Sequence, residues 1–483
     1  MPLTAFRADA GLTIGSGHVM RSLALAQAFA AGGWSVALAA TKETFETIPA
    51  LAAAKVAQII LSGKPETEAV ELAAHAPIDV LVVDHYGRDV TFERACRAFA
   101  KRIVVIDDLA NRPHECDVLA DSNAASAAAY RNLVPASCRV LAGPAFAALD
   151  PAFRRVRATA LARHDGRPVE RVLVSFGQVD PPNATALALT ALAGAGYGGS
   201  IDVVLGRNAP NFEAVRKKLL ASARLHVDTV SMAALMTDAD FAVGAGGTTS
   251  WERCCLGLPS LLVEIADNQR GVTATLERAG AAASVGPINQ LNPEALAHSL
   301  RAFLADGRRR RQMATTCSAL VDGRGAERIL LASIGSVPTK AGEVTLRLAE
   351  ADDEAWLLEL QQKPQTRKFA NNPRSPDRHE HARWFRAIVS DPARLLAIVE
   401  AAGKPVGMLR LDRGTDADRI NIATDPAHHR RGIGAAALAL AAGVTPGRPL
   451  DAQILAGNAP SLALFQAMGY RQAGKDLFRR EPL

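Results

Sequence analysis

The chain has 483 residues, a formal net charge of +6, and 49% hydrophobic and 22% charged residues. Its length exceeds that of one ordinary domain of roughly 100–200 residues, and its composition excludes a disordered chain. No apolar run approaches the roughly 20 residues that span a bilayer, and the N-terminus lacks the pattern of a secretory signal, so we expect a cytoplasmic protein without a membrane span.

Residues 1–150 and 151–335 each alternate apolar strands with amphipathic helices, a pattern typical of a parallel sheet covered on both faces. The first block is expected to contain strands at 35–40, 57–61, 80–83 and 103–106 and helices at 20–31 and 91–100. The second is expected to contain strands at 171–176, 201–205 and 241–244 and helices at 153–164, 184–193 and 211–221. We therefore predict an α/β fold with two Rossmann-like lobes, which bind a ligand in the cleft between them at the carboxyl ends of their strands.

Turn-forming residues interrupt this pattern at 335–342, and a third domain is predicted at 343–483. Its expected elements are strands at 344–349, 395–401, 405–412 and 420–423 and helices at 352–362, 379–389 and 436–442. About 140 residues are enough for a separate hydrophobic core.

The first candidate site lies at Gly15-Ser16-Gly17-His18, which opens a helix containing Arg21. The two glycines allow a tight turn and close backbone approach, and the helix N-terminus favours a diphosphate. A lone histidine is more often structural, but beside an anion-binding turn His18 is a candidate general base. Tyr86, just past the strand at 80–83, is placed either to bind a sugar or to cover the lobe as a surface residue.

The second candidate site follows the strand at 241–244, where Gly244-Ala245-Gly246-Gly247-Thr248-Thr249 offers backbone and hydroxyl donors to phosphates. Glu252 is a candidate acceptor for ribose hydroxyls, although a helix-capping role fits its spacing equally well. The segment Ala266-Asp267-Asn268-Gln269 follows further along the chain.

These motifs resemble the nucleotide-binding segment of GT-B glycosyltransferases. Together with Arg7-Ala8-Asp9 and the Ser175-Phe176-Gly177 segment, where Gln178 departs from the usual glycine or serine, they more closely resemble the UDP-2,4-diacetamido-2,4,6-trideoxy-β-L-altropyranose hydrolases of pseudaminic acid biosynthesis. The resemblance covers about residues 1–334. It implies a GT-B architecture and hydrolysis to UDP and the free sugar, with inversion at the anomeric carbon and His18 as the base. The substrate-binding residues that it implies are Asp9, Gly15, Gly17, Arg21, Tyr86, Gly246, Gly247, Thr248, Thr249, Glu252, Asn268 and Gln269.

The chemistry of such a reaction makes few demands on the protein. UDP leaves readily as an anion, so no paired carboxylic acids are needed of the kind that a glycosidase uses to protonate its leaving group. A positioned water, a base and donors around the diphosphate are sufficient, and no metal is required.

The third domain carries Arg430-Arg431-Gly432-Ile433-Gly434 after the strand at 420–423, a loop of backbone N–H groups and charge suited to a pyrophosphate. With Asn458 and the segment 464–470, this resembles GNAT N-acetyltransferases. The resemblance implies acetyl-CoA as co-substrate, held by Arg430, Arg431, Gly432, Gly434 and Asn458. Two positions depart from the family pattern: His429 replaces Gln or Arg, and Phe465 replaces the tyrosine that protonates the departing thiolate.

The segment from Glu380 to Phe385 is similar to the His-x-x-Trp-Phe motif of acetyltransferases that act on amino-sugar nucleotides, which makes His381 a candidate contact for the acceptor sugar. We therefore expect a bifunctional enzyme that acetylates a 4-amino UDP-sugar and hydrolyses the diacetamido product. The alternatives are a GT-B glycosyltransferase that uses a UDP-sugar donor, a hydrolase with a degenerate GNAT domain, and a UDP-sugar-binding regulator.

Other partners are not expected. The positive charge suits anionic ligands in general, but the longest basic run, Arg308–Arg311, has no interleaved aromatic residues for stacking on nucleic-acid bases and is predicted to form a solvated helix face. The six cysteines include no Cys-x-x-Cys pair and no His cluster has zinc spacing, so no metal site is expected. Adjacent Cys254 and Cys255 are expected to pack as small apolar residues.

Overall fold

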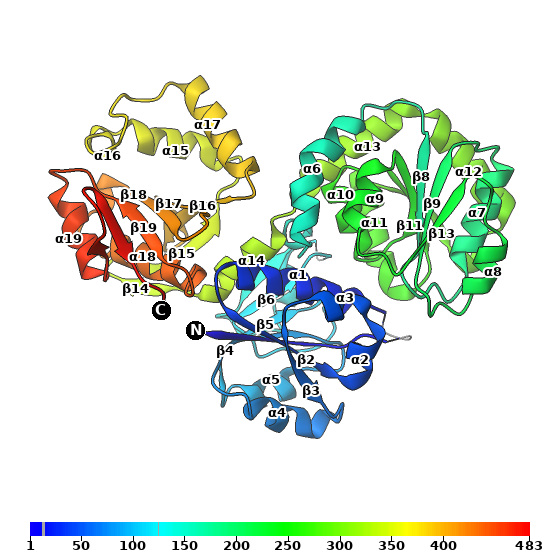
Figure 1. Cartoon of the computed structure of the whole chain (residues 1–483), viewed down its shortest axis with the longest axis horizontal. Coiled ribbons are helices and arrows are strands. Elements are labelled where there is room, and N and C mark those ends of the chain that lie inside the picture. Colours follow the sequence, from blue (N-terminus) through cyan, green and yellow to red (C-terminus); the bar gives the residue numbers. More distant parts are fainter. Residues whose placement is uncertain (12–14, 124) are drawn as a thin grey trace. The chain divides into compact units, whose positions relative to one another are not determined.

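A computed structural model describes residues 1–11, 15–123 and 125–483 (Figure 1). These residues form two compact units: one comprises Ala5–Gln27 with Ala37–Ala326, and the other comprises Met1–Thr4, Ala28–Val36 and Glu327–Leu483. Within the described residues, every helix is too short or too polar to cross a membrane.

The first sheet has seven strands in the order β3-β2-β1-β4-β5-β6-β7. Its strands are β1 (Leu3–Ala8), β2 (Ser35–Thr41), β3 (Ala57–Leu61), β4 (Ile78–Asp84), β5 (Ala100–Ile106), β6 (Val118–Asp121) and β7 (Arg139–Ala142). The pair β2–β3 and the pairs from β4 to β7 are parallel. Strand β4 is buried along nearly its whole length, as expected for a central parallel strand that is covered on both faces.

The helices of this part include α1 (Gly17–Ala31), α2 (Lys42–Thr47), α3 (Pro49–Ala53), α4 (Pro65–Ala73) and α5 (Val90–Cys96). Helix α5 is shorter than the helix predicted at 91–100, because the chain turns after Cys96 and Ala100 already belongs to β5. Short 3-10 turns lie at Ala127–Tyr130 and Pro144–Phe146.

The second sheet has six parallel strands in the order β10-β9-β8-β11-β12-β13. Its strands are β8 (Arg171–Ser175), β9 (Ser200–Leu205), β10 (Ala223–Val227), β11 (Phe241–Ala245), β12 (Ser260–Glu264) and β13 (Ala283–Pro287). Its helices are α6 (Pro151–Arg163), α7 (Ala184–Gly194), α8 (Phe212–Lys217), α9 (Met232–Asp238), α10 (Thr249–Cys255), α11 (Arg270–Ala279), α12 (Pro293–Ala305) and α13 (Gly307–Leu320), with 3-10 turns at Asp267–Gln269 and Ile288–Gln290. Buried Cys254 and Cys255 pack into the core of this part, as predicted.

The third sheet has eight strands in the order β14-β15-β16-β17-β18-β19-β21-β20 and is mainly antiparallel. Its strands are β14 (Val337–Thr339), β15 (Gly342–Leu348), β16 (Arg394–Ala401), β17 (Lys404–Asp412), β18 (Asp418–Thr424), β19 (Leu450–Gln453), β20 (Arg471–Gln472) and β21 (Leu477–Arg480). The helices are α14 (Gly325–Ile334), α15 (Asp353–Gln362), α16 (Pro364–Arg367), α17 (Arg378–Ser390), α18 (Ile433–Val444) and α19 (Ala459–Ala467), with a 3-10 turn at Pro426–His428. The predicted break at 335–342 contains a strand, because β14 pairs with β15 in a tight hairpin.

Candidate active site

Both parallel sheets place a topological switch point beside a predicted motif. In the first sheet the strand order reverses direction between β1 and β4, and in the second between β8 and β11. Ligands of open α/β sheets bind outside the carboxyl ends of the strands at such points. The loop after β1 leads to His18, the loop after β4 carries Tyr86, and the loop after β11 carries Gly246 and Gly247.

His18 lies at the start of α1, where it is held by an aspartate that ends β4. Asp84 Oδ1 is 2.6 Å from His18 Nδ1, and Asp84 is fully buried. Arg21, one turn along α1, donates from Nε to Asp84 Oδ2 and from Nη2 to Asp84 Oδ1, each over 2.6 Å. The strand end thus fixes the orientation of both side chains.

This geometry also fixes the tautomer of neutral His18. A carboxylate only accepts hydrogen bonds, so the Nδ1 proton of His18 is donated to Asp84. Arg21 Nη2 lies 3.0 Å from the same Nδ1, but a guanidinium only donates, so these two donors converge on Asp84 Oδ1 and do not bond to each other. The lone pair of His18 is therefore on Nε2, the arrangement that a general base requires.

The charges around Asp84 keep it ionised. Burial opposes ionisation, but the positive charge of Arg21 and the contact with His18 outweigh it and lower the pKa of Asp84 to about 2. Arg21 also donates from Nη1 to Asp108 Oδ2 over 2.8 Å. The other oxygen of Asp108, Oδ1, is buried and has no hydrogen bond of strict geometry among the described residues, and the Tyr86 hydroxyl is a neighbouring group that interacts with this carboxylate.

Tyr86 closes one side of His18. The two rings meet edge to face, with centroids 4.5 Å apart and an interplanar angle of 86°. Burial, reinforced by the Asp108 carboxylate, raises the pKa of Tyr86 to about 12, while the side chain of Asn268 acts in the opposite direction. The structure thus brings together His18, Arg21, Tyr86 and Asn268, four of the predicted site residues.

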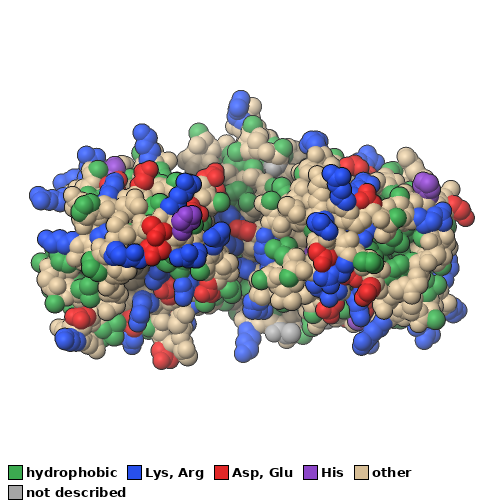
Figure 2. Space-filling model, turned by 90° about the horizontal axis from the view of Figure 1, so that it is seen from above, with side chains coloured by type: hydrophobic (Ala, Val, Ile, Leu, Met, Phe, Trp, Pro, Cys, Tyr) green, Lys and Arg blue, Asp and Glu red, His purple; other side chains and the backbone are tan. Residues whose placement is uncertain are grey.

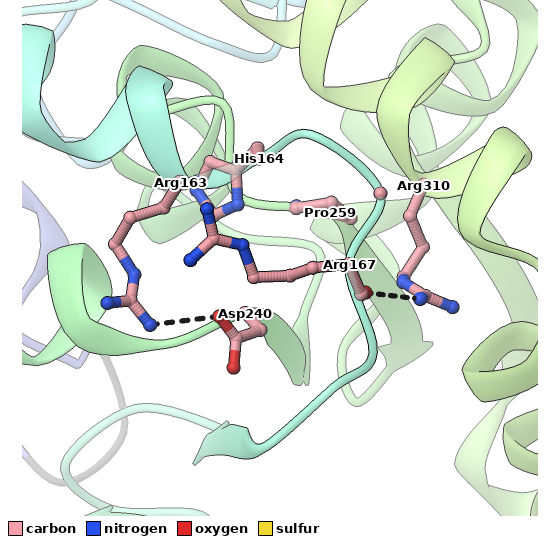
Figure 3. Close-up of a pocket in the computed structure, with 7 residues that line it drawn as sticks. Arg163, His164, Arg167, Asp240, Pro259 and Arg310 are labelled. Carbon is pink, nitrogen blue, oxygen red and sulfur yellow. Dashed lines mark hydrogen bonds and ion pairs between the residues drawn. The ribbon is translucent and has the colours of Figure 1, made fainter.

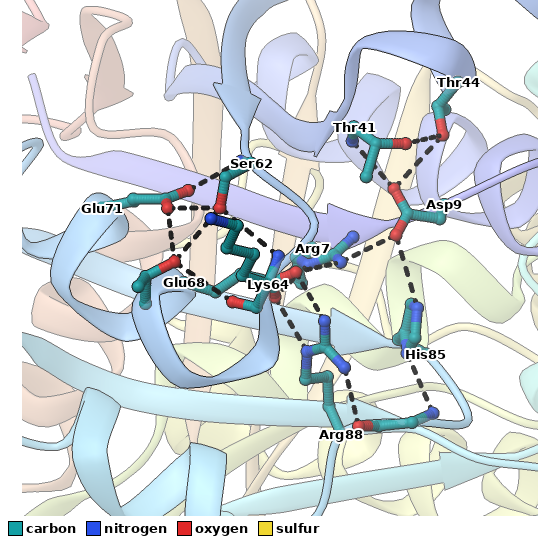
Figure 4. A network of polar contacts seen from close by, with 12 residues as sticks. Arg7, Asp9, Thr41, Thr44, Ser62, Lys64, Glu68, Glu71, His85 and Arg88 are labelled. Atoms are coloured by element: carbon teal, nitrogen blue, oxygen red, sulfur yellow. Dashed lines mark hydrogen bonds and ion pairs between the residues drawn. The ribbon is translucent and has the colours of Figure 1, made fainter.

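Asp9 belongs to a separate buried network (Figure 4). Its Oδ1 accepts from Thr41 N over 2.9 Å and from Thr44 Oγ1 over 3.2 Å, and its Oδ2 lies 2.7 Å from Arg7 Nη2 and 3.3 Å from His85 Nε2. These contacts occupy its carboxylate. Asp9, which was predicted to bind substrate, can therefore act on it only indirectly, by positioning His85, the residue before Tyr86.

The same network contains a carboxylate shared by two arginines. Arg7 and Arg88 both form paired hydrogen bonds with the fully buried Glu68 (Figure 4). Burial disfavours the charge, but Arg88 and Arg7 outweigh it and lower the pKa of Glu68. This cluster ties β1 to α4 and to the loop after β4, and so supports the segment that carries Tyr86.

The predicted glycines provide close approach. Gly15 has a φ of 77°, a left-handed conformation that suits glycine. A Cβ atom on Gly17 would lie 3.0 Å from Thr248 Oγ1, so the turn before α1 approaches the loop after β11 closely. In that second loop a Cβ atom on Gly246 would collide with Thr273 Oγ1. Both loops are therefore packed more tightly than a residue with a side chain would allow.

The hydroxyl residues Thr248 and Thr249 begin α10, and Thr248 is its N-cap residue without using its side chain for capping. Gln269 is partly committed, because its Oε1 accepts from the backbone N–H of Ile265 over 3.1 Å. Asn268, beside it in the turn Asp267–Gln269, is exposed.

Glu252 lies on α10 with an unsatisfied carboxylate. Its Oε2 is buried and has no hydrogen-bond partner among the described residues. Burial raises the pKa of Glu252 to about 7, although the positive charge of neighbouring Arg253 opposes the shift. Arg253 donates instead to Ala245 O over 2.6 Å and to Ser250 Oγ over 2.9 Å. An unpartnered buried acceptor fits a hydroxyl-bearing ligand better than a helix-capping role.

A small pocket in the second sheet lies away from these residues (Figure 3). Asp240 and Pro259 in its lining directly precede β11 and β12, so it lies at the amino edge of the sheet. Arg163 Nη2 lies 2.9 Å from Asp240 Oδ1, and Arg310 Nη2 donates to Arg167 O over 2.8 Å. Arg310 is buried, so the expectation of a solvated face for the whole run Arg308–Arg311 is wrong at this residue, which ties α13 to neighbouring backbone carbonyls.

In the third sheet, two parallel strands part beside the predicted loop. The pairing of β18 with β19 ends at Ile420 and Ala452, while β18 continues to Thr424. Arg430 and Gly432 both have positive φ, 60° and 87°, and Gly432 is the N-cap residue of α18. Arg430 and Arg431 are exposed, which fits an anion-binding loop.

The remaining predicted residues of this domain have local roles. A Cβ atom on Gly434 would lie 2.9 Å from Leu464 Cδ2, so α18 and α19 pack closely there. Asn458 caps α19 by accepting from Ser461 N over 3.2 Å, which leaves its amide group free to donate. His381 is buried, lies with its ring centroid 5.2 Å from that of Trp384, and has no hydrogen-bond partner at Nε2 among the residues that the structure describes.

Two residues of the first site were not predicted. Neither Asp84 nor Asp108 belongs to a motif. Asp84 is the last residue of β4, and Asp108 is the second residue after the end of β5. Polar residues at the carboxyl ends of parallel strands are the signal that would have identified both. Across residues 1–11, 15–123 and 125–483, no group of three or more His, Cys, Asp or Glu side chains is arranged to hold a metal ion.

Two Rossmann-like sheets with polar groups at their carboxyl edges and a mixed sheet with a positive-φ loop before α18 define a multidomain α/β protein with candidate sites in both compact units. Residues 343–471 match the acetyltransferase (GNAT) domain family. The predicted fold class, α/β with two Rossmann-like lobes followed by a GNAT α/β domain, is thereby confirmed.

Two curated proteins are similar to this chain over less than half of its length. The spore coat polysaccharide biosynthesis protein SpsG of Bacillus subtilis is 29% identical over 206 residues, which span 41% of this chain and 59% of SpsG. The UDP-2,4-diacetamido-2,4,6-trideoxy-β-L-altropyranose hydrolase of Campylobacter jejuni is 26% identical over 238 residues, 49% of this chain and 81% of the hydrolase. The crystal structure of Acinetobacter baumannii MurG aligns with 68% of this chain and 98% of its own, at 17% identity and a TM-score of 0.48. The chain is thus a homologue of the hydrolase that also carries a C-terminal GNAT domain.

Proposed function

We propose that the chain hydrolyses UDP-2,4-diacetamido-2,4,6-trideoxy-β-L-altropyranose to UDP and the free sugar, with inversion at the anomeric carbon. The observation that carries this proposal is the oriented His18–Asp84 pair beside Tyr86 and Asn268, in a chain homologous to a hydrolase of that substrate. We place the two Rossmann-like lobes at residues 1–150 and 151–335, with the hydrolytic site formed by loops of both.

In the proposed mechanism, His18 Nε2 accepts a proton from a water molecule that attacks the anomeric carbon. Asp84 holds the Nδ1 proton and stabilises the imidazolium that forms, as a carboxylate behind a catalytic histidine does. The bond from the anomeric carbon to the diphosphate oxygen breaks, and UDP departs as an anion. Attack from the face opposite UDP inverts the configuration.

The remaining residues would bind the leaving group and the sugar. The turn with Gly15 and Gly17 presents the N-terminus of α1 to the diphosphate. Gly246, Gly247, Thr248 and Thr249 add backbone and hydroxyl donors, and Glu252 accepts from the ribose hydroxyls. Arg21, Tyr86, Asn268 and Gln269 lie toward the sugar. Such donors act mainly by stabilising the charge that develops on the leaving diphosphate.

We further propose that the GNAT domain, at residues 343–483, transfers acetyl from acetyl-CoA to the 4-amino group of the precursor UDP-sugar. The family match and the loop from Arg430 to Gly434, beside the parted strands β18 and β19, support this second activity. Acetyl-CoA would supply an activated thioester. The exposed Arg430 and Arg431 and the N–H groups before α18 would bind its pyrophosphate, and Asn458 would donate from its amide.

Replacing His18 by alanine tests the first activity. We expect UDP release from the diacetamido substrate to be abolished, while UDP affinity measured by calorimetry stays within about twofold, because the phosphate contacts come mainly from backbone groups. The matched control is His75→Ala, since His75 is exposed and remote from the motif. Near-wild-type turnover by His18→Ala would contradict the mechanism.

The same assay discriminates the alternatives. A glycosyltransferase would release UDP only when a sugar or lipid acceptor is added, whereas a hydrolase releases it in buffer. A UDP-sugar-binding regulator would release none. A degenerate GNAT domain would leave hydrolysis intact and release no CoA when the 4-amino UDP-sugar and acetyl-CoA are both present.

A further inference from the structure

A basic segment precedes α17 in the GNAT domain. We call residues 363–378 the basic arm; it contains α16 and the basic residues Lys363, Arg367, Lys368, Arg374 and Arg378, against the single acidic residue Asp377. Figure 2 shows blue Lys and Arg side chains spread over the surface in this view, with red Asp and Glu side chains among them. Within the arm, Lys368, Arg374 and Arg378 are exposed, and Lys363 and Arg367 are half-buried.

Two side-chain contacts fix where the basic arm lies. Lys363 Nζ is 2.8 Å from Asp425 Oδ1, directly after the end of β18. Asn371 Nδ2 donates to Oε1 of Gln453, the last residue of β19, over 3.2 Å. The arm therefore spans the carboxyl ends of β18 and β19, where the pairing of these two strands has stopped.

This opening is the place where the proposed acetyl transfer would occur. Parted strands leave backbone N–H and C=O groups without sheet partners, and these groups are available to an acyl thioester. The loop from Arg430 to Gly434 follows β18 directly, so the pyrophosphate end of acetyl-CoA would lie on the same side. The basic arm therefore lies beside the opening that an acceptor amine would use.

Arg367 is the half-buried arginine of the arm, whereas Lys368, Arg374 and Arg378 are exposed. Lys363 pairs with Asp425, and Arg374 pairs with Glu380. Arg367 donates from Nη1 to Gln361 Oε1 over 2.9 Å and from Nη2 to the backbone oxygen of Asn372, but no carboxylate contacts it. Its Nε is buried and has no partner among the described residues, and burial lowers the pKa of Arg367.

A partly buried guanidinium without a counter-charge is costly unless a ligand supplies the charge. Guanidinium groups bind phosphates in a forked geometry, and Lys368, next in the chain, adds a second positive charge. We propose that Arg367, assisted by Lys368, binds a phosphate group of the amine acceptor, so that the GNAT domain selects an anionic, phosphate-bearing amine and rejects cationic polyamines. This inference rests on the proposed acetyl transfer.

The test uses the full-length protein and measures CoA release with acetyl-CoA and the 4-amino UDP-sugar. Arg367→Gln is expected to raise KM for the UDP-sugar about tenfold or more, the effect of losing a charge-assisted contact, with KM for acetyl-CoA unchanged. UDP, used as the probe, is expected to inhibit acetyl transfer competitively with the acceptor, and Arg367→Gln to weaken this inhibition by a similar factor. Arg367→Lys, which keeps the charge, is expected to fall in between.

The matched control is Arg386→Gln, because Arg386 is an exposed arginine of α17 outside the arm. It is expected to leave every constant within about twofold. If Arg367 only holds the arm in place, Arg367→Gln would lower kcat or alter KM for acetyl-CoA while UDP inhibition stays unchanged, and the inference would be overturned. If the wild-type protein releases no CoA with any nucleotide-linked amine, the proposed acetyl transfer itself fails, and the inference fails with it.

Discussion

Replacing Glu252 by glutamine is expected to stabilise the protein and to weaken UDP binding at the same time. The pKa of Glu252 is raised by burial from 4.5 to about 7, so the folded state holds a proton on this carboxyl at pH values where the unfolded chain has lost it. Stability therefore falls as pH rises from about 4.5 to 7, and the full loss persists above pH 7. At about 1.4 kcal/mol for each pH unit, the ionised carboxylate destabilises the folded state by about 3 kcal/mol.

Glutamine has nearly the same shape and does not ionise. The stability of Glu252→Gln relative to wild type should therefore increase by about 2–3 kcal/mol between pH 5 and pH 8.5. Urea titrations followed by tryptophan fluorescence measure this difference, since buried Trp251 directly precedes Glu252. Glu277→Gln on α11 is the control, because Glu277 is exposed and its substitution should change stability by less than about 0.5 kcal/mol at either pH.

Binding should change in the opposite direction. A carboxylate accepts from two ribose hydroxyls at once, and such charge-assisted bonds contribute roughly 1.5–3 kcal/mol each. Glu252→Gln should weaken UDP affinity about tenfold or more at pH 8.5, measured by titration calorimetry. Comparing the variant with wild type at each pH cancels the titration of the ligand's own phosphate. A variant that is less stable at pH 8.5, or that binds UDP as tightly as wild type, would refute the assignment of Glu252 as an unsatisfied acceptor.

Three further predictions concern the first site. Asp84→Asn should lower hydrolysis by about 10²–10⁴-fold, because an amide no longer fixes the tautomer of His18, and unchanged turnover would remove Asp84 from the mechanism. The pKa of Asp84 is lowered to about 2 in the folded state, so in wild type its contribution to stability should be lost as pH falls from about 4 toward 2. If Asp84→Asn and wild type unfold identically in acid, this prediction is wrong. Hydrolysis should persist in excess EDTA, and loss of activity that added Mg²⁺ restores would show a metal requirement.

Strand positions were predictable where the apolar run stands alone in the sequence. Strand β3 has the predicted bounds, and the helix predicted at 20–31 is most of α1. Strands β1, β6, β7, β10, β12 and β13 of the first two sheets were not predicted, and neither were β14, β20 and β21 of the third. Strand β10, with the sequence Ala-Arg-Leu-His-Val, lies at the sheet edge and is only partly buried, so its polar residues hide the alternation that marks a strand.

The candidate site was predictable only in part, and for a physical reason. Glycines mark these loops in the sequence: Gly15 has a positive φ, and a Cβ atom on Gly17 or Gly246 would crowd a threonine hydroxyl. The partner of His18 lies 66 positions away in the chain, and no local pattern reveals which carboxylate a fold will bring to it. The same holds for the buried oxygen of Asp108 and for the raised pKa of Glu252, since both depend on burial by residues that are distant in the sequence.

Phe465 is the residue at which the acetyltransferase most clearly departs from its family pattern, and the structure predicts that restoring tyrosine there is harmless. Phe465 lies on α19 and is 7% exposed, with its ring edge to face against Tyr470 at a centroid distance of 4.8 Å. Burial raises the pKa of Tyr470, and its hydroxyl has no hydrogen-bond partner among the described residues.

Tyrosine adds only a para hydroxyl to the ring of Phe465, and a buried hydroxyl left without a partner costs roughly 1–3 kcal/mol, so the variant is expected to fold. The thiolate of CoA is a tolerable leaving group in water, and general acid assistance is worth about 10²–10⁴ in rate where it operates. We expect Phe465→Tyr to release CoA at least as fast as wild type, and Tyr470→Phe, the matched control, to keep its rate within about threefold. A Phe465→Tyr variant that folds but releases CoA more slowly would show that the phenyl ring itself shapes the acyl site, whereas a large loss in Tyr470→Phe would make Tyr470 the proton donor that position 465 lacks.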